Sequence, residues 1–177
     1  MENETKRNEV SNEVVGTKYY HYTIKPYLKT IIEEGKIRQG KSRIKKVKPI
    51  TWVSTNQLME NTSLKGAVCT STGKNLGTMS FESQHEAVGC VRIQVDPSVL
   101  TKWSVLKHKA GYHTLSKRFG YDLAQQLDTE GLEVGARPSE WYGSLNPITE
   151  DKFLSIEVWN GSEWVEDETY WSLKISA

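Results

Sequence analysis

A strand-like run rich in polar groups, residues 18–23 (Lys-Tyr-Tyr-His-Tyr-Thr), is followed at once by a compact helix signal. Pro26 favours the first turn of that helix, and apolar residues recur at i, i+3 and i+4 from Leu28, which is one helix face. Gly35 is well placed to end the helix as its C-terminal cap. Hydrogen-bonding groups on a buried strand are costly unless something satisfies them. We therefore expect a strand, a helix packed on a sheet, and a ligand as one way of satisfying the polar groups.

The rest of the chain predicts an α+β fold with an antiparallel-leaning sheet and short helices in a single domain. Residues 49–54, 87–95 and 152–159 read as further strands, and Asn160-Gly161 is a two-residue hairpin signal. Residues 58–64 and 113–126 are predicted to be helices, and Asn56 is the candidate N-cap of the first. Residues 71–77 are predicted to be a loop. Residues 171–175 read as a last strand. We expect residues 1–13 to be a disordered arm and residues 14–177 to form the domain.

Charge is unevenly distributed, although the net charge of the 177-residue chain is only +1. Residues 36–48 contain seven basic residues and no acidic one. Such asymmetry is typical of a surface for a polyanion, and a solvated loop is the other reading. The best candidates for nucleic-acid phosphate contacts are Arg38, Lys41, Arg43, Lys45 and Lys46.

Several function classes lack their sequence signals. Cys69 and Cys90 form neither a disulfide framework nor a zinc spacing, and the histidines beyond His21 do not stand at metal-binding spacings, so we expect no metal. Phosphate-loop and nucleophile-elbow motifs are missing. Without a hydrophobic N-terminal signal or an apolar run near 18 residues, we expect a soluble, cytoplasmic protein that does not contact a membrane.

His21 and Thr23 are two residues apart, so on a strand they share one face while Tyr22 points the other way. A histidine beside a hydroxyl can hold a ribose or another vicinal diol. A purely structural strand histidine is the alternative. Trp52 and Ser54, at the end of the next strand, offer an indole for stacking and a hydroxyl for hydrogen bonding.

Glu140 lies in a Gly-, Pro- and Ser-containing loop that enters a strand, directly before Trp141 and Tyr142. A carboxylate held there can orient a ribose 2′-hydroxyl and stabilise an oxocarbenium-like transition state while an N-glycosidic bond breaks. An ordinary surface carboxylate is the alternative reading.

Three short motifs together resemble the ADP-ribosyltransferase superfamily, and most nearly its DarT-type nucleic-acid ADP-ribosyltransferases and their small relatives. The motifs are Tyr-His-Tyr-Thr at 20–23 with the helix ending Gly-Lys-Ile at 35–37, Thr-Trp-Val-Ser at 51–54, and Ser-Glu-Trp-Tyr at 139–142 with Pro-Ile at 147–148 and Ile-Glu-Val-Trp at 156–159. They occur in order over most of residues 17–165.

The resemblance implies a split, strongly bent antiparallel sheet with NAD in its cleft. It implies that His21 holds the adenosine ribose with Thr23 close by, that Tyr22 shapes the pocket, and that Ser54 lies near the nicotinamide ribose. Glu140 would be the catalytic acidic residue. Arg92 and Arg137 are the candidates for the arginine that DarT-type enzymes use near the catalytic centre.

Three functions follow as hypotheses. The leading one is mono-ADP-ribosylation of a DNA or RNA base with NAD as substrate, in phage defence or a toxin system. The alternative is a DNA glycosylase that uses no NAD, flips a base into the same cleft against Trp52, Trp141 or Tyr142, and excises it. The third is a binding module for a nucleotide or nucleic acid that has no catalytic activity.

Overall fold

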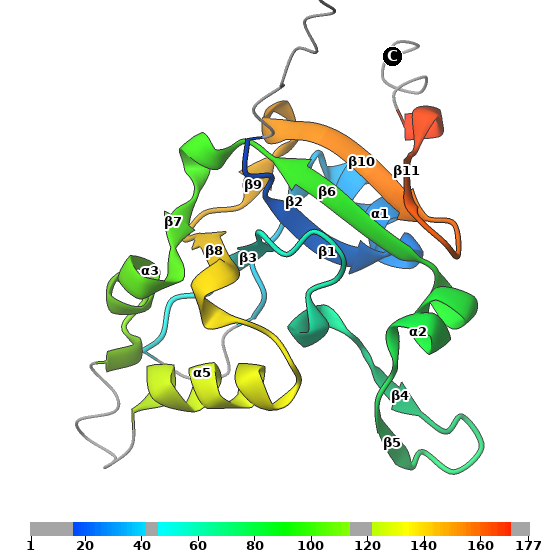
Figure 1. The fold of residues 1–177 in the computed structure, drawn as a ribbon, viewed down its shortest axis with the longest axis horizontal. Coiled ribbons are helices and arrows are strands. Elements are labelled where there is room, and N and C mark those ends of the chain that lie inside the picture. Colours follow the sequence, from blue (N-terminus) through cyan, green and yellow to red (C-terminus); the bar gives the residue numbers. More distant parts are fainter. Residues whose placement is uncertain (1–15, 42–45, 114–121, 171–177) are drawn as a thin grey trace, which may run out of the picture.

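Seven strands form one sheet in the order β11–β10–β6–β1–β3–β8–β7, and every pairing in it is antiparallel (Figure 1). The computed structural model describes residues 16–41, 46–113 and 122–170. The large sheet consists of β1 (Tyr20–Ile24), β3 (Thr51–Ser54), β6 (Cys90–Val95), β7 (Thr101–Lys102), β8 (Trp141–Ser144), β10 (Phe153–Trp159) and β11 (Trp164–Glu166).

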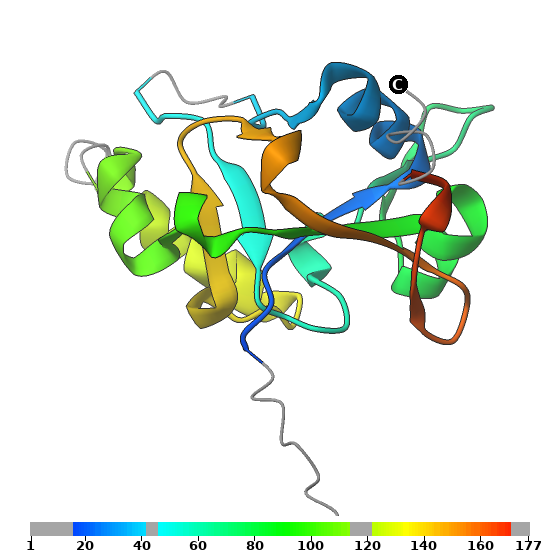
Figure 2. The same cartoon turned by 90° about the horizontal axis from the view of Figure 1, so that it is seen from above.

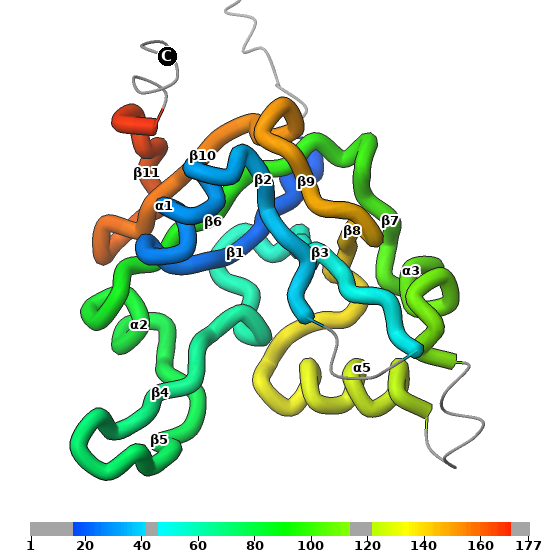
Figure 3. Tube along the Cα trace, turned by 180° about the vertical axis from the view of Figure 1, so that it is seen from behind, coloured from blue at the N-terminus to red at the C-terminus, as the bar shows by residue number. Residues whose placement is uncertain are grey.

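Two small two-stranded sheets and a set of short helices complete the described part of the chain. The small sheets pair β2 (Lys36–Ile37) with β9 (Ile148–Thr149) and β4 (Gly66–Val68) with β5 (Asn75–Thr78). The α-helices are α1 (Lys25–Glu34), α2 (Phe81–Val88), α3 (Trp103–Lys109) and α5 (Leu123–Glu133). The 3₁₀ turns are η1 (Asn61–Ser63), η2 (Pro97–Val99), η3 (Pro138–Glu140) and η4 (Glu150–Lys152). The β4–β5 hairpin projects from the body of the molecule (Figures 1 and 3).

The large sheet opens between β1 and β3. These strands share a single register pair, Tyr20 with Ser54, whereas β1 pairs with β6 at five consecutive positions. Figure 2 shows β3 and β8 running in a clearly different direction from β1 and β6. The two parts of the sheet therefore diverge, and side chains of β1 and β3 face the space where they separate.

Three clusters of buried side chains make up the core. Helix α1 packs Leu28 and Ile31 against β6 and β10, helices α3 and α5 pack against β3 and β8 around Trp103 and Trp141, and Tyr20, Tyr22 and Met59 form a smaller cluster. Helix α1 ends at Gly35, whose φ of 63° is the left-handed conformation that glycine adopts without strain. Strands of the one large sheet contribute to all three clusters, so the described residues form one compact α+β domain.

The predicted α+β class, the antiparallel pairing and the helix ending at Gly35 are confirmed. Strands β10 and β11 form the predicted hairpin, but their connection spans residues 160–163 and not only Asn160-Gly161. The strand expected from residue 14 begins at Tyr20, and residues 71–77 include part of β5 rather than forming only a loop. The helix expected over 113–126 is not continuous, because Asp122 is outside any helix and caps α5, which begins at Leu123; residues 114–121 lie outside the described residues. The expected arm over 1–13 and strand over 171–175 lie outside the described residues.

The helix predicted over residues 58–64 is wrong, and its error affects the site. The segment from Thr55 to Met59 is irregular, and the only helical piece is the 3₁₀ turn η1. Asn56 Oδ1 accepts hydrogen bonds from the backbone N–H groups of Leu58 and Met59, so it caps a tight turn and not a helix. Glu60 is the N-cap of η1.

Candidate functional site

A cavity of about 540 Å³ is walled by residues 20–23 of β1 and residues 52–54 of β3, where the two strands separate. Its volume is within the usual range of small-molecule sites, about 300–1,000 Å³. Six of the eight residues predicted to be catalytic or to bind substrate line it, namely His21, Tyr22, Thr23, Trp52, Ser54 and Trp141. The cavity therefore brings together the opening motif and the second strand motif.

His21 is fixed across the opening of the sheet. Its Nδ1 lies 2.9 Å from the carbonyl oxygen of Trp52, and because a carbonyl only accepts, Nδ1 carries the hydrogen and donates it. Burial lowers the pKa of His21 below its ordinary value of 6.5; the bond to Trp52 opposes this shift, and the nearby charge of Lys65 adds to it. The ring is therefore neutral at physiological pH, and Nε2 is a hydrogen-bond acceptor suited to a ligand hydroxyl.

Two buried hydroxyl residues lie beside His21. Thr23 shares the His21 face of β1, as predicted, and is 4% exposed. Ser54 is 2% exposed, and its Oγ accepts the Asn56 backbone N–H at 3.1 Å. Ser54 therefore holds the turn that ends β3 and also lines the cavity.

Aromatic rings form one side of the cavity. Trp52 contacts Trp141 edge to face with ring centroids 6.1 Å apart, and it also packs on Trp103, whose indole N–H donates to Asp128 at 2.5 Å. Tyr112 also lines the cavity. These contacts fix the orientation of the rings. The indole nitrogen of Trp141 is enclosed and has no hydrogen-bond partner among the described residues, so a ligand acceptor could satisfy it.

Two cationic side chains also line the cavity, Arg38 and Lys65. Lys65 Nζ lies 5.6 Å from the centroid of the Tyr27 ring, and burial lowers the pKa of Lys65. Arg38 is largely exposed and pairs with Glu34 one turn earlier in the chain, with Nε and Oε2 2.5 Å apart. Together they make the cavity attractive to an anionic group such as a phosphate.

Among the described residues that line the cavity, Glu60 is the acidic one, and the sequence does not predict a role for it. It is only 6% exposed. Its Oε1 accepts hydrogen bonds from the Thr62 hydroxyl at 2.8 Å and from the Thr62 backbone N–H at 3.2 Å. Its Oε2 is enclosed and has no hydrogen-bond partner in the described part of the chain. The sequence signal for Glu60 is an acidic residue six positions after Ser54, just past the end of a strand that is predicted to contribute to the site.

Glu140 and Tyr142 are not among the described residues that line the cavity. Glu140 ends η3, its carbonyl oxygen accepts the Thr55 backbone N–H at 2.9 Å, and its carboxylate lies 3.7 Å from Arg137. Tyr142 packs edge to face on Tyr19, with ring centroids 4.9 Å apart. Their catalytic and binding roles stay predictions. Glu140 Oε2, like Glu60 Oε2, is buried without a hydrogen-bond partner among the described residues, but of the two carboxylates Glu60 lines the cavity with His21.

The predicted phosphate contacts are distributed unevenly around the site. Arg38 lines the cavity, Lys41 and Lys46 are exposed, and Arg43 and Lys45 lie outside the described residues. Of the two arginine candidates, Arg137 is exposed beside Glu140, and Arg92, in β6, is buried against the rings of Tyr20 and Trp164. Neither arginine lines the cavity among the described residues.

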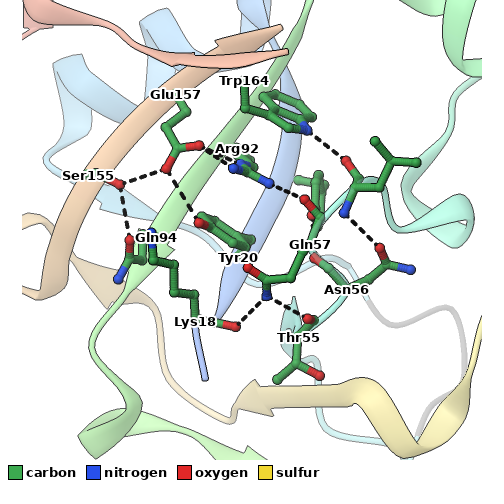
Figure 4. Close-up of polar contacts among 12 residues, drawn as sticks. Lys18, Tyr20, Thr55, Asn56, Gln57, Arg92, Gln94, Ser155, Glu157 and Trp164 are labelled. Carbon is green, nitrogen blue, oxygen red and sulfur yellow. Dashed lines mark hydrogen bonds and ion pairs between the residues drawn. The ribbon is translucent and has the colours of Figure 1, made fainter. Parts of the chain in front are cut away.

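The segment that leads from Ser54 to Glu60 is held by side chains from three different strands. Figure 4 shows two of them, Arg92 and Trp164. Three consecutive backbone carbonyls each accept a hydrogen bond from a different side chain, and we call the three donors, Tyr22, Arg92 and Trp164, the carbonyl clamp. The pairs are the Tyr22 hydroxyl with Asn56 O at 2.5 Å, Arg92 Nη1 with Gln57 O, and Trp164 Nε1 with Leu58 O at 2.7 Å. An irregular segment thereby obtains the fixed geometry that a helix or strand would otherwise supply.

Arg92 is itself held rigidly. Its Nε donates to Glu157 Oε2 at 2.7 Å, and Nη2 donates to the same oxygen. The guanidinium carbon lies 4.0 Å from the Tyr20 ring centroid and 4.7 Å from that of Trp164. The Tyr20 hydroxyl donates to Glu157 Oε1 at 3.4 Å (Figure 4). The ion pair therefore orients the guanidinium N–H that reaches Gln57.

Comparisons with protein-family models, with curated proteins and with solved structures gave no significant match. Within residues 16–41, 46–113 and 122–170, no helix is long and apolar enough to span a membrane. The function is therefore inferred from the site itself.

Proposed function

We propose that this chain is an enzyme of N-glycosidic bond chemistry that modifies nucleic acid, and that its reaction is mono-ADP-ribosylation of a DNA or RNA base with NAD as substrate. The observation that carries the proposal is the fixed, neutral His21 in a cavity that also holds a buried carboxylate, aromatic rings and two cations. The resemblance of residues 20–37 to the opening motif of the ADP-ribosyltransferase superfamily supports it.

The residues of the cavity fit a dinucleotide by type. His21 Nε2 can accept a ribose hydroxyl, Trp52 and Tyr112 can stack on a planar ring, and Lys65 and Arg38 can bind phosphate oxygens. The enclosed Glu60 Oε2 and Trp141 N–H add one acceptor and one donor that the described residues leave unsatisfied. A ligand with hydroxyls, phosphates and an aromatic base matches this set.

In the proposed reaction the bond between C1′ of the nicotinamide ribose and the nicotinamide nitrogen breaks. Its electron pair leaves with nicotinamide, which becomes neutral, and positive charge develops on the sugar. A nitrogen or oxygen of the nucleic-acid base then bonds to C1′ and loses its proton to water. The protein contributes by positioning the ribose and stabilising the transient positive charge.

The basic run of residues 36–48 is the reason that we propose nucleic acid as the partner. It begins with Lys36 in β2 and reaches the cavity wall at Arg38, and Lys41 and Lys46 beyond it are exposed. Phosphate contacts from such side chains would bring a strand to the cavity mouth, and they predict binding that weakens as salt rises.

The test is incubation of the purified protein with DNA or RNA oligonucleotides, with and without NAD, followed by mass spectrometry of the oligonucleotide and a nicotinamide assay. We expect nicotinamide release and an oligonucleotide mass increase equal to one ADP-ribose, both lost in His21→Ala. His108→Ala is the matched control, because His108 is exposed and does not line the cavity. Absence of both products in the wild type with DNA and with RNA would contradict the proposal.

A second candidate uses the same cavity without NAD. The aromatic wall of Trp52, Trp141 and Tyr112 is also suited to a base flipped out of a nucleic acid, and the broken bond is again N-glycosidic. Water would then attack C1′, the base would leave with the bonding pair and take up a proton, and an abasic site would remain. Alkali-labile sites formed in DNA without NAD would identify this reaction.

A further inference from the structure

Glu60 is a buried acid whose own chain satisfies only part of its hydrogen-bonding capacity. A carboxylate can accept about four hydrogen bonds, and Glu60 accepts two, both at Oε1 and both from Thr62. Its Oε2 is enclosed without a partner among the described residues, although the side chain lines the cavity. Leaving a buried carboxylate oxygen unpaired is costly, so its retention needs a reason.

The positioning of Glu60 is also more elaborate than a core residue needs. The irregular segment before it is held by the carbonyl clamp, whose members come from β1, β6 and β11. The clamp's arginine is part of a buried ion pair with Glu157, with side chains 10% and 12% exposed. Buried ion pairs contribute little net stability, so conformational specificity is the better account of this one.

The groups facing Glu60 indicate what it would contact. Lys65 and Arg38 line the same cavity, so an anionic ligand portion has cationic partners there. His21, neutral and bonded through Nδ1 to Trp52, offers an acceptor but no donor toward the cavity from its Nε2. Two acceptors, His21 Nε2 and the Glu60 carboxylate, then belong to residues that line one cavity. A pair of neighbouring hydroxyls, as on a ribose, supplies the matching donors.

We propose that Glu60 is the site's catalytic carboxylate: it accepts a hydrogen bond from a ribose hydroxyl of the bound nucleotide and stabilises the positive charge that develops on that sugar. The proposal rests on the proposed function. Glu60 forms no bond to the sugar, so the electron pair of the broken bond leaves with nicotinamide or the base as before. Tyr22, Arg92 and Trp164 are positioning residues that act through the segment carrying Glu60.

The first experiment compares Glu60→Gln with Glu86→Gln, a control whose side chain is exposed on α2 and does not line the cavity. Glutamine keeps an oxygen for Thr62 and removes only the charge, so Glu60→Gln retains the fold. We expect the rate of product formation to fall about 100-fold or more in Glu60→Gln, as for loss of a group that stabilises transition-state charge, and to stay within a few-fold of wild type in Glu86→Gln. Glu140→Gln tests the competing assignment. A wild-type rate in Glu60→Gln, or a larger loss in Glu140→Gln than in Glu60→Gln, would overturn the assignment.

A binding measurement separates this proposal from the proposed function. ADP-ribose has ribose hydroxyls and no nicotinamide bond to break, so its affinity can be measured by calorimetry whether or not turnover is found. We expect a loss of about tenfold in Glu60→Gln, because a hydrogen bond to a charged acceptor becomes one to a neutral acceptor. Absence of turnover with this tenfold loss would contradict the enzyme and support Glu60 as a ribose ligand. Equal affinities of the wild type and Glu60→Gln for ADP-ribose would overturn the assignment of Glu60 as a ribose ligand.

The clamp is tested by removing single donors. Tyr22→Phe and Trp164→Phe each delete one hydrogen bond and keep a ring, and Trp159→Phe is the matched control in the same aromatic cluster. We expect kcat to fall at least several-fold in both clamp variants with KM for NAD changed less, and Trp159→Phe to behave as wild type. Equal loss of kcat in all three variants would show a structural role only and contradict the clamp.

Discussion

His21 and Trp52 are joined by a hydrogen bond across the point where β1 and β3 separate, with His21 Nδ1 2.9 Å from the Trp52 carbonyl oxygen. The bond lies beyond the single register pair that connects the two strands. It therefore ties the two parts of the sheet at the cavity wall, fixes the imidazole tautomer and leaves Nε2 as an acceptor. The same contact serves the fold and the site.

The first prediction concerns pH. Burial lowers the pKa of His21 below 6.5, so as pH falls below about 6.5 the unfolded chain binds a proton that the folded chain resists. The contribution of neutral His21 to stability is therefore complete above that pH. It is lost progressively below it, by up to about 1.4 kcal/mol per pH unit until the folded pKa is reached. Between pH 7.5 and pH 5.5, the free energy of unfolding measured by denaturation should fall more for the wild type than for His21→Gln. Equal falls for the two proteins would contradict a lowered pKa of His21 in the folded chain.

The second prediction concerns the buried ion pair of Arg92 and Glu157. Arg92→Ala leaves a carboxylate that is 12% exposed without its partner, and we expect the free energy of unfolding to fall by about 3–5 kcal/mol. Adding Glu157→Gln should recover part of this loss, because the uncompensated charge disappears. Lys29→Ala, which breaks an exposed pair with Glu33, should cost less than about 1 kcal/mol. Chemical denaturation measures the free energy of unfolding of all three variants. If Arg92→Ala lowers it as little as Lys29→Ala does, Arg92 is not needed to compensate the buried charge of Glu157.

The third prediction concerns the approach of α5 to the cavity. A Cβ added at Gly131 would lie 2.5 Å from Trp141 Cζ2, far inside a normal contact, and Trp141 is only 4% exposed. Alanine favours helix by about 1 kcal/mol, but we expect the overlap to exceed this and to shift the Trp141 ring. Gly131→Ala should therefore lower both stability and ADP-ribose affinity. Leu132→Ala, at an exposed position of the same helix, should change neither. An increase in stability on Gly131→Ala would contradict the close packing.

The fourth prediction separates the two cysteines. Hydrogen bonding to the hydroxyl of Ser71, with Sγ and Oγ 3.2 Å apart, and to Thr72 lowers the pKa of Cys69 to about 7. Cys90 is fully buried, and burial raises the pKa of its thiol. At pH 7 iodoacetamide should modify Cys69 first and Cys90 only after unfolding, as read by peptide mass spectrometry. Ser71→Ala should slow the reaction at Cys69. Modification of both cysteines at the same rate in the folded protein would contradict the difference between the hydrogen-bonded thiol of Cys69 and the buried thiol of Cys90.

The sequence predicted what local patterns determine. The helix ending at Gly35 follows from Pro26, the periodicity from Leu28 and the glycine cap, and the shared face of His21 and Thr23 follows from strand alternation. The α+β class and the hairpin at Asn160-Gly161 follow in the same way. Such features depend on residues close in the chain.

Glu60 could not be found in that way because its position depends on distant contacts. Its segment reads as helical, yet the carbonyl clamp holds it irregular through side chains from residues 22, 92 and 164. Hydrogen bonds between segments so far apart leave no periodic pattern. The aromatic neighbours of Glu140 in the sequence predict a role in the site, but its side chain lies beside Arg137 and is not among the described residues that line the cavity.

The most direct test of N-glycosidic chemistry at the His21 cavity is mass spectrometry of oligonucleotides after incubation with wild type, His21→Ala and Glu60→Gln, each with and without NAD. The account predicts an ADP-ribose adduct with the wild type that requires NAD and falls about 100-fold or more in both variants. Abasic sites formed without NAD would favour base excision in the same cavity. Unmodified oligonucleotides under every condition, or equal modification by all three proteins, would contradict the account.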